Sequence, residues 1–233
     1  MKVCVILPTY NEAGNIEAII KRLVIAVPEA DILVVDDNSP DGTSDKVRIL
    51  QENNPQLKLL VRMQNKGFAQ SYLDGFRQAL SRPELTHIVT MDADFSHDPF
   101  YLPGMLAKSE QFDVVIGSRY APGGGVAGWE YWRMLLSAFA NRYCRTITGI
   151  PLRDCTAGFS VIRLHSLLKL SLEEIHMSGY AFLMELKYLL WKRGALFTEV
   201  PIIFHNRAQG ESKMSRHIIA EGVLAPWRLR GRA

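Results

Sequence analysis

Acidic residues follow a short apolar segment near the middle of the chain, in the sequence HIVTMDADFSHDPF at 87–100. The apolar residues at 88–91 predict a buried strand that ends at Asp92, because a core strand offers a carboxylate no partner. Residues two apart in an extended chain point to the same side, so we expect Asp92 and Asp94 to present their oxygens together across Ala93. Two such carboxylates repel each other, and a hard divalent cation such as Mg²⁺ or Mn²⁺ relieves that repulsion.

Strands and helices alternate along the first half of the chain, with short connections. The predicted strands lie at 3–7, 32–35, 57–61, 88–91 and 114–116, and the helices at 16–24, 44–51, 69–80 and just after 98. Thr43 is the expected N-cap of the second helix, and Asp98 and Pro99 are the expected cap and first residue of the fourth. Five such alternations predict an α/β fold with a mostly parallel central sheet covered by helices.

Polar clusters follow three of these strands, with the sequences PTYNE, DDNSPDG and DAD. The carboxyl ends of parallel strands share one edge, so these groups are expected to converge there, where open α/β sheets bind ligands. An acidic pair alone is also common in solvated turns, and this position is what favours a metal site. Neither G-x-G-x-x-G nor a P-loop is present, so a metal and scattered basic residues are the expected way to bind phosphates.

The organisation changes after Gly117. The sequence predicts a flexible, lid-like loop at 121–128, a helix at 129–147, a turn and strand at 154–163, a helix at 180–192, a final strand at 196–204 and an amphipathic helix at 217–227. Pro201 indicates an edge position for the final strand, and Pro226 is expected to break the last helix.

Composition excludes several classes of protein. The 233 residues are 48% hydrophobic, and 27 basic against 24 acidic residues give a net charge of +3, which is too balanced for a nucleic-acid-binding surface. Three cysteines cannot all pair and lack metal-ligand spacing, which indicates a reducing compartment. No apolar run reaches the roughly 18 residues of a membrane span, and the N-terminal run is shorter than that of an export signal, so we expect neither.

Six ordered motifs resemble those of family 2 glycosyltransferases with the GT-A fold. They are VILPTYNE at 5–12, VVDDNSPDGT at 34–43, NKG at 65–67, MDADFSHDP at 91–99, GSRY at 117–120 and GESKM at 210–214. Within that family the pattern looks like that of the dolichyl-phosphate or polyprenyl-phosphate mannosyltransferases. The resemblance implies a single GT-A domain over 1–233, with a Rossmann-like nucleotide-sugar half at 1–117 and an acceptor-side half with interfacial helices at 118–233.

The resemblance also implies an activity and a site. The activity is metal-dependent, inverting transfer of mannose from GDP-mannose to dolichyl or polyprenyl phosphate on the cytoplasmic side of a membrane, where some relatives recruit small membrane subunits. The residues implied for guanosine are Pro8, Tyr10, Glu12, Val35 and Asp37; for Mg²⁺ or Mn²⁺ and the donor diphosphate, Asp92, Ala93, Asp94 and Ser96; and for the phosphates, Arg119, Arg133, Arg207 and Lys213. Asp94, Arg119 and Arg133 are the expected catalytic residues, and Ser96 replaces a glutamine that ligates the metal in some members.

An arginine-rich site suits this chemistry, because an acceptor phosphate is already anionic and needs orientation and charge shielding more than a base. A polyprenyl-phosphate glucosyltransferase that uses UDP-glucose would have the same fold and site. A non-catalytic nucleotide-sugar or lipid-phosphate module is a further alternative, which the intact Asp92, Asp94, Arg119 and Lys213 disfavour. A nucleotidyltransferase could also use the paired acids, but it would not explain the arginine-rich second half or the interfacial tail.

Several residues keep two interpretations. Arg119 and Arg133 can instead form surface salt bridges, and His97 can be an ordinary loop histidine. Trp129, Tyr131 and Trp132 either pack in the core or line a lipid path, Asp154 caps a turn or touches the sugar, and Glu185 faces solvent or the site. The amphipathic segments at 134–147 and 218–227, with nearby arginines, are expected to lie in a membrane interface, although the basic C-terminal tail is also explained as a solvated terminus.

Overall fold

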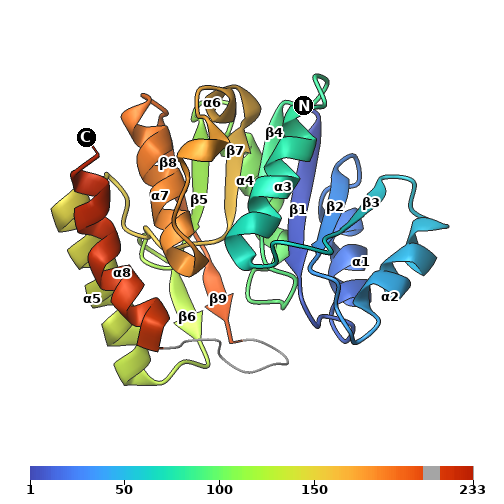
Figure 1. The fold of residues 1–233 in the computed structure, drawn as a ribbon, viewed down its shortest axis with the longest axis horizontal. Coiled ribbons are helices and arrows are strands. Elements are labelled where there is room, and N and C mark those ends of the chain that lie inside the picture. Colours follow the sequence, from blue (N-terminus) through green and yellow to red (C-terminus); the bar gives the residue numbers. More distant parts are fainter. Residues whose placement is uncertain (207–215, 233) are drawn as a thin grey trace.

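A seven-stranded sheet with the order β3-β2-β1-β4-β7-β5-β8 runs through the centre of the molecule (Figure 1). The structure is a computed structural model that describes residues 1–206 and 216–232. The strands are β1 Val3–Thr9, β2 Asp31–Asp36, β3 Leu57–Val61, β4 His87–Thr90, β5 Val114–Ser118, β7 Ser160–Arg163 and β8 Phe197–Pro201. Every pairing is parallel except those of β7, which is antiparallel to both β4 and β5. The mostly parallel α/β fold is therefore confirmed.

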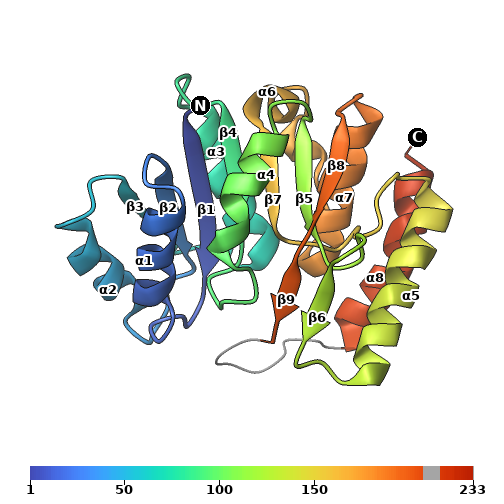
Figure 2. The ribbon, with the colours of Figure 1, turned by 180° about the vertical axis from the view of Figure 1, so that it is seen from behind.

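Helices cover both faces of this sheet (Figures 1 and 2). They are α1 Ile16–Ala26, α2 Thr43–Gln51, α3 Phe68–Leu80, α4 Leu102–Lys108, α5 Tyr131–Thr148, α6 Leu164–Leu168, α7 Gly179–Lys192 and α8 Arg216–Arg230, with single 3-10 turns at Pro99–Tyr101 and Leu172–Glu174. One core lies between the sheet and α1, α2 and α4, and the other lies on the face of α3 and α7. Ile6 and Leu7 are neighbours in β1 and belong to opposite cores, which explains the uninterrupted apolar runs of these strands.

Strand register brings the polar loops together. Pro8 in β1 lies opposite Val35 in β2, and Ile6 lies opposite Thr90 in β4, so these three strands end at the same edge of the sheet. The segments that follow them start with Tyr10, Asp37 and Met91. Their convergence on one edge agrees with the prediction from the sequence.

The glycine-rich segment at 121–128 is more ordered than the predicted loop. Gly125–Ala127 form β6, which pairs in parallel with β9 (Ile203–His205) in a small second sheet. The predicted final strand is therefore two strands, β8 and β9, separated by Ile202. Among the described strands β8 pairs only with β5, which confirms the edge position that Pro201 indicated.

The predicted break at Pro226 was wrong, because α8 runs through this residue to Arg230. Ala225 and Leu229 are fully buried on either side of the proline, and packing of this kind contributes most of the stability of a helix in a protein. Thr43 was also assigned wrongly as a cap. It is the first residue of α2, and Gly42, at φ 85°, is the N-cap.

Glu185 in α7 is fully buried and faces neither solvent nor the site, contrary to both expectations. Its carboxylate accepts hydrogen bonds from the backbone N–H groups of His176 (2.9 Å) and Met177 (2.7 Å) and forms an ion pair with Arg232. The basic tail is thus partly tied to α7. Over the described ranges 1–206 and 216–232, no helix combines the length and hydrophobicity needed to cross a membrane.

Candidate active site

Local hydrogen bonds fix the acidic loop after β4. Asp94 is 4% exposed, and its Oδ1 accepts hydrogen bonds from the backbone N–H (3.0 Å) and the hydroxyl (2.6 Å) of Ser96. The backbone N–H of Asp92 donates to Nδ1 of the buried His97 (3.0 Å), so this ring nitrogen carries no proton. His97 therefore shapes the loop. Phe95, which lies between Asp94 and Ser96 in the chain, adopts the left-handed backbone conformation at φ 63°.

Left-handed backbone recurs along this edge of the sheet. The non-glycine residues with positive φ in the described chain each follow one of the first four strands, namely Asn11, Asn38, Asn65 and Phe95, with φ between 52° and 63°. Asparagine tolerates this conformation, whereas phenylalanine is strained in it. Strain that the surrounding structure maintains is common at ligand-binding sites, which favours a functional role for the loop that holds Asp92 and Asp94.

The acidic pair suits a divalent cation that is shared with a substrate. Within the part of the chain that the structure describes, no cluster of three or more His, Cys, Asp or Glu residues could hold a metal, so Asp92 and Asp94 would leave other positions to phosphate and water. Mg²⁺ is usually bound in this way. Within the described ranges 1–206 and 216–232, the fully buried Tyr72 hydroxyl has no hydrogen-bond partner. Burial and the charges of Asp92 and Asp94 raise the pKa of this hydroxyl. An orphaned hydroxyl near two carboxylates fits a site that is completed by ligands.

Ser96 was predicted as a third metal ligand. Its side chain is fully buried, and its hydroxyl donates to Asp94. In this arrangement Ser96 orients the carboxylate of Asp94. Direct ligation of a metal by Ser96 remains a prediction.

The residues predicted to bind guanosine lie around the ends of β1 and β2. Val35 is fully buried, so its side chain packs in the core and only its backbone is near the edge. Tyr10 is 43% exposed in the loop after β1. Glu12 accepts a hydrogen bond from Asn15 Nδ2 (2.7 Å). Pro8 lies opposite Val35 in the paired strands, so these residues lie close together. Their roles in binding the nucleotide remain predictions.

Asp37 is already held by the protein. Its carboxylate pairs with the buried guanidinium of Arg62 and accepts hydrogen bonds from the backbone N–H of Gly67 (2.7 Å) and from Ser71 Oγ (3.0 Å). Gly67 has φ 139°, which other residues rarely adopt, and this explains the glycine in its motif. Arg62 also pairs with Asp74 (2.6 Å), so the network ties the loops after β2 and β3 to α3.

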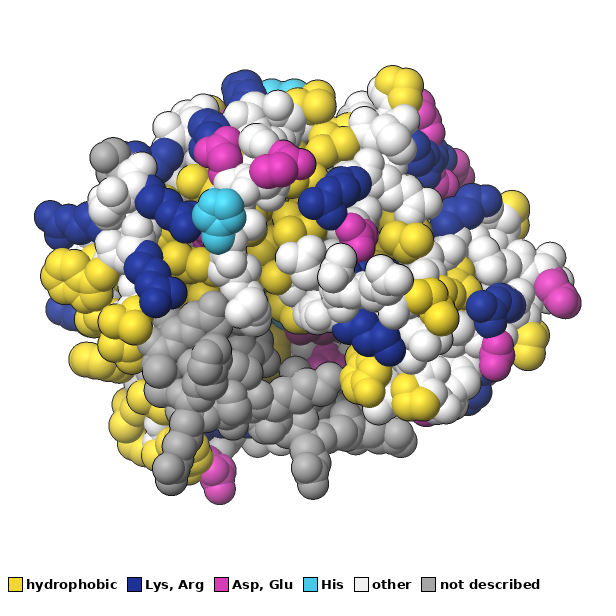
Figure 3. All heavy atoms as spheres, viewed as in Figure 1, with side chains coloured by type: hydrophobic (Ala, Val, Ile, Leu, Met, Phe, Trp, Pro, Cys, Tyr) yellow, Lys and Arg dark blue, Asp and Glu magenta, His cyan; other side chains and the backbone are white. Residues whose placement is uncertain are grey.

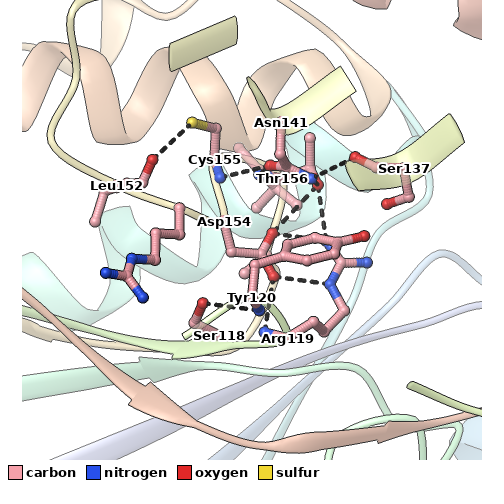
Figure 4. Close-up of polar contacts among 12 residues, drawn as sticks. Ser118, Arg119, Tyr120, Ser137, Asn141, Leu152, Asp154, Cys155 and Thr156 are labelled. Atoms are coloured by element: carbon pink, nitrogen blue, oxygen red, sulfur yellow. Dashed lines mark hydrogen bonds and ion pairs between the residues drawn. The ribbon is translucent and has the colours of Figure 1, made fainter. Parts of the chain in front are cut away.

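Arg119 forms the centre of a buried network beyond the end of β5 (Figure 4). Asp154 accepts from its backbone N–H (3.0 Å), Nε (2.8 Å) and Nη2 (2.7 Å), and Thr156 Oγ1 accepts from Nη2 (2.8 Å). Burial alone would raise the pKa of Asp154, but the charge and hydrogen bonds of Arg119 outweigh it and lower the pKa. Asp154 thus orients Arg119. Its carboxylate also accepts a hydrogen bond from Thr156 Oγ1 (3.4 Å) in the turn that follows, in line with the predicted turn cap, and its contact with the sugar remains a prediction.

Trp129 links the two arginines that were predicted to be catalytic. The guanidinium carbon of Arg133 lies 4.4 Å from the centre of a Trp129 ring, and that of Arg119 lies 5.7 Å from it. The Trp129 Nε1–H is buried and has no hydrogen-bond partner among the residues that the structure describes. Two guanidinium groups and an indole N–H therefore gather on the β5 side of the site, as a binding site for an anion requires.

Sequence reasoning missed some functional candidates. Arg62 could have been found as a lone arginine directly after an apolar strand, whereas nothing in the helical pattern around Tyr72 marked a buried hydroxyl. The partnership of Arg119 with Asp154 spans 35 residues and had no local signal. Arg207 and Lys213 lie outside the described residues.

Solved structures share this architecture. The glucosyl-3-phosphoglycerate synthase of Mycobacterium tuberculosis, in complex with Mn²⁺, UDP and glucosyl-3-phosphoglycerate, superimposes with a TM-score of 0.68 at 17% identity, covering 98% of this chain and 79% of that one. The mannosyl-3-phosphoglycerate synthase of Rubrobacter xylanophilus gives 0.67 at 17% identity, covering 100% and 73%. The fold is therefore that of GT-A glycosyltransferases.

The sequence comparison is more specific. Residues 4–170 match the family model described as "Glycosyl transferase family 2", and the chain belongs to that family of glycosyltransferases. It is 40% identical to the "Undecaprenyl-phosphate mannosyltransferase" of Micrococcus luteus, covering 96% of this chain and 92% of the relative. It is also 40% identical to the "Polyprenol monophosphomannose synthase" of Mycolicibacterium smegmatis (98% and 87%) and 35% identical to the "Dolichol-phosphate mannosyltransferase" of Pyrococcus furiosus (98% and 64%).

Proposed function

We propose that this protein transfers mannose from GDP-mannose to the phosphate of a polyprenyl phosphate, with inversion at the anomeric carbon. The observation that carries the proposal is the 40% identity, over 96% or more of the chain, to two relatives named for mannosyl transfer to such lipids. The names of these two relatives favour mannose over glucose as the transferred sugar and favour an enzyme over a binding module.

The donor would bind along the ends of β1, β2 and β4. The loops with Tyr10, Glu12 and Asp37 would surround the nucleoside, and Asp92 and Asp94 would hold Mg²⁺ or Mn²⁺ against the diphosphate. A bound divalent cation would neutralise the charge that develops on the departing diphosphate. Ser96 and the left-handed turn at Phe95 hold the carboxylate of Asp94 in place. This carboxylate would therefore need little rearrangement to bind the cation.

The acceptor would approach from the side of Arg119 and Arg133. An oxygen of the lipid phosphate would form a bond to the anomeric carbon while the bond from that carbon to the diphosphate breaks, and GDP would leave as an anion. No proton has to be removed from an ionised phosphate, so the protein needs no strong base. Asp154 fixes the guanidinium of Arg119, and Trp129 lies beside both arginines. These groups would orient and shield the incoming anion.

A surface formed by α5 and α8 is suited to the membrane that carries such an acceptor. Hydrophobic and basic side chains alternate along this edge of the molecule (Figure 3). The exposed fractions are 59% for Trp132, 67% for Phe139 and 56% for Trp227. The Tyr143 hydroxyl accepts from Trp227 Nε1 (2.8 Å) and so joins the two helices. Apolar side chains beside arginines bind anionic lipid interfaces, and we place this surface on the cytoplasmic face of a membrane.

The proposal is tested by incubating the protein with polyprenyl phosphate in vesicles and labelled GDP-mannose, GDP-glucose or UDP-glucose. We expect label to enter the lipid phase from GDP-mannose, to stop with a chelator and to resume with Mg²⁺ or Mn²⁺. Asp94→Ala should abolish transfer, and Arg133→Lys should impair it despite the unchanged charge. Preferential use of UDP-glucose, or binding without turnover, would contradict the proposal.

A further inference from the structure

Lys187 in α7 is a buried cation that the proposed reaction does not use directly. Its side chain is 3% exposed, whereas lysine is almost never fully buried unless it is paired. Its ammonium group donates three hydrogen bonds, all to backbone carbonyls: Ala157 O at 2.6 Å, Cys155 O at 3.2 Å and Leu183 O at 3.2 Å. The three N–H donors of the lysine are therefore all satisfied.

Two of these carbonyls belong to the segment that orients Arg119. Asp154 and Thr156 bind the Arg119 guanidinium. Cys155 directly follows Asp154 in the chain, and Ala157 directly follows Thr156. On the other side of the segment, Asn141 Oδ1 in α5 accepts from the backbone N–H of Cys155 (2.7 Å). The segment is thus held between an amide oxygen of α5 and the ammonium group of α7.

The charges around Lys187 do not balance. Among the groups that the structure describes, Asp154 is the only carboxylate that acts on Lys187, and it already pairs with Arg119, which repels the ammonium. The remaining neighbours with titratable groups are the buried thiols of Cys144 in α5 and Cys155. Among the described residues, two cations therefore accompany one anion in this desolvated region. A surplus positive charge of this kind is costly alone and attracts an anionic ligand.

We propose that Lys187 is a positioning residue for the acceptor side of the site: its ammonium group holds the segment at 154–157 in place and adds positive potential behind Arg119, so that an anionic phosphate monoester binds there. The phosphate of the acceptor lipid is the ligand with this chemistry, and this assignment rests on the proposed function.

The ammonium form has a limited pH range. Burial lowers the pKa of Lys187 to about 8, although the charge of Asp154 opposes the shift. Above that pH the neutral amine loses one donor and its charge. The kcat/KM for the acceptor should therefore fall above about pH 8, whereas the KM for the donor, which would bind at the ends of β1, β2 and β4, should not change.

The test compares the wild type with Lys187→Met, which removes charge and donors, and Lys187→Arg, which keeps both. Lys192→Met, on the exposed side of the same helix, is the matched control. We expect Lys187→Met to lower kcat/KM for polyprenyl phosphate about tenfold at pH 7, to lose the alkaline decline and to leave KM for the donor unchanged. Lys187→Arg should restore part of the activity, and Lys192→Met should behave as the wild type.

Two measurements that do not require transfer accompany this assay. The ¹³Cε shift of Lys187 should titrate near pH 8, and the amides of Cys155 and Thr156 should exchange faster in Lys187→Met than in the control. If the wild type transferred nothing to polyprenyl phosphate while both signals appeared, the proposed function and the acceptor role would fail, but the positioning role would stand. Unchanged amide exchange, or equal acceptor kcat/KM for Lys187→Met and the wild type from pH 7 to 9, would overturn the inference.

Discussion

The ion pair between Asp154 and Arg119 gives a prediction whose size follows from its burial. Asp154 is fully buried, its side-chain partner Arg119 is 10% exposed, and three Arg119 nitrogens donate to the carboxylate at 2.7–3.0 Å. Asp154→Asn keeps the shape of the side chain and removes its charge. The change removes the negative charge that the structure shows beside the cations of Arg119 and Lys187.

Removal of one partner from a buried ion pair costs about 3–5 kcal/mol. Asparagine can still accept a hydrogen bond, and Thr156 continues to bind Arg119, so we expect the lower end, about 3 kcal/mol in the free energy of unfolding. For a chain of this length that corresponds to a fall in Tm of roughly 6–12 °C. The loosened guanidinium should also raise KM for the acceptor and leave KM for the donor unchanged.

Urea unfolding and steady-state kinetics provide the assay. The control is Asp45→Asn in α2, whose carboxylate pairs with Arg48 at 2.6 Å while the two side chains are 77% and 56% exposed. That exposed pair should contribute less than about 0.5 kcal/mol. If Asp154→Asn unfolded with the same free energy as the control and kept its acceptor KM, the claim that Asp154 orients Arg119 would be refuted.

Three further predictions concern other parts of the molecule. Tyr72→Phe removes a buried hydroxyl that has no described partner. The free energy of unfolding should therefore stay the same or rise by up to about 1 kcal/mol, while kcat falls. Lower stability with an unchanged kcat would contradict this prediction. Burial lowers the pKa of His87 from 6.5 to about 4, so between these pH values the unfolded state binds a proton that the folded state does not. As the pH falls from 6.5 to 4, the free energy of unfolding of the wild type should therefore drop by about 3 kcal/mol relative to His87→Gln, as measured by denaturant unfolding. The double variant Trp132→Ser/Phe139→Ser should bind anionic vesicles about tenfold more weakly in sedimentation, and equal binding would exclude the α5 and α8 surface.

The first half of the fold was predictable because its strands are buried on both faces. Such strands appear as continuous apolar runs, and the predicted β2 and β3 differ from the observed strands by no more than one residue at either end. The insertion of β7 between β4 and β5 had no local signal, since its pairing partners are far away in the sequence. The same is true of β6 and β9, which are short and find each other only in the folded chain.

The site divides in a similar way. The acidic pair at Asp92 and Asp94 was recognisable because strand ends are marked in the sequence by a change from apolar to polar residues. Lys187 was not, because helical periodicity places a lysine on the solvent side, and its partner carbonyls belong to a segment about 30 residues earlier. Trp132 had two interpretations, in a core or along a lipid path, and its 59% exposure on α5 excludes the core.

The central claim is that Asp92 and Asp94 gather a divalent cation and the diphosphate of the sugar donor at the end of β4. The most direct test is a crystal structure with GDP-mannose and Mn²⁺, in which anomalous scattering locates the metal. We predict a single strong peak within bonding distance of a carboxylate oxygen of Asp92 or Asp94 and of the donor diphosphate. A donor bound elsewhere, or a metal that contacts neither acid, would contradict the account.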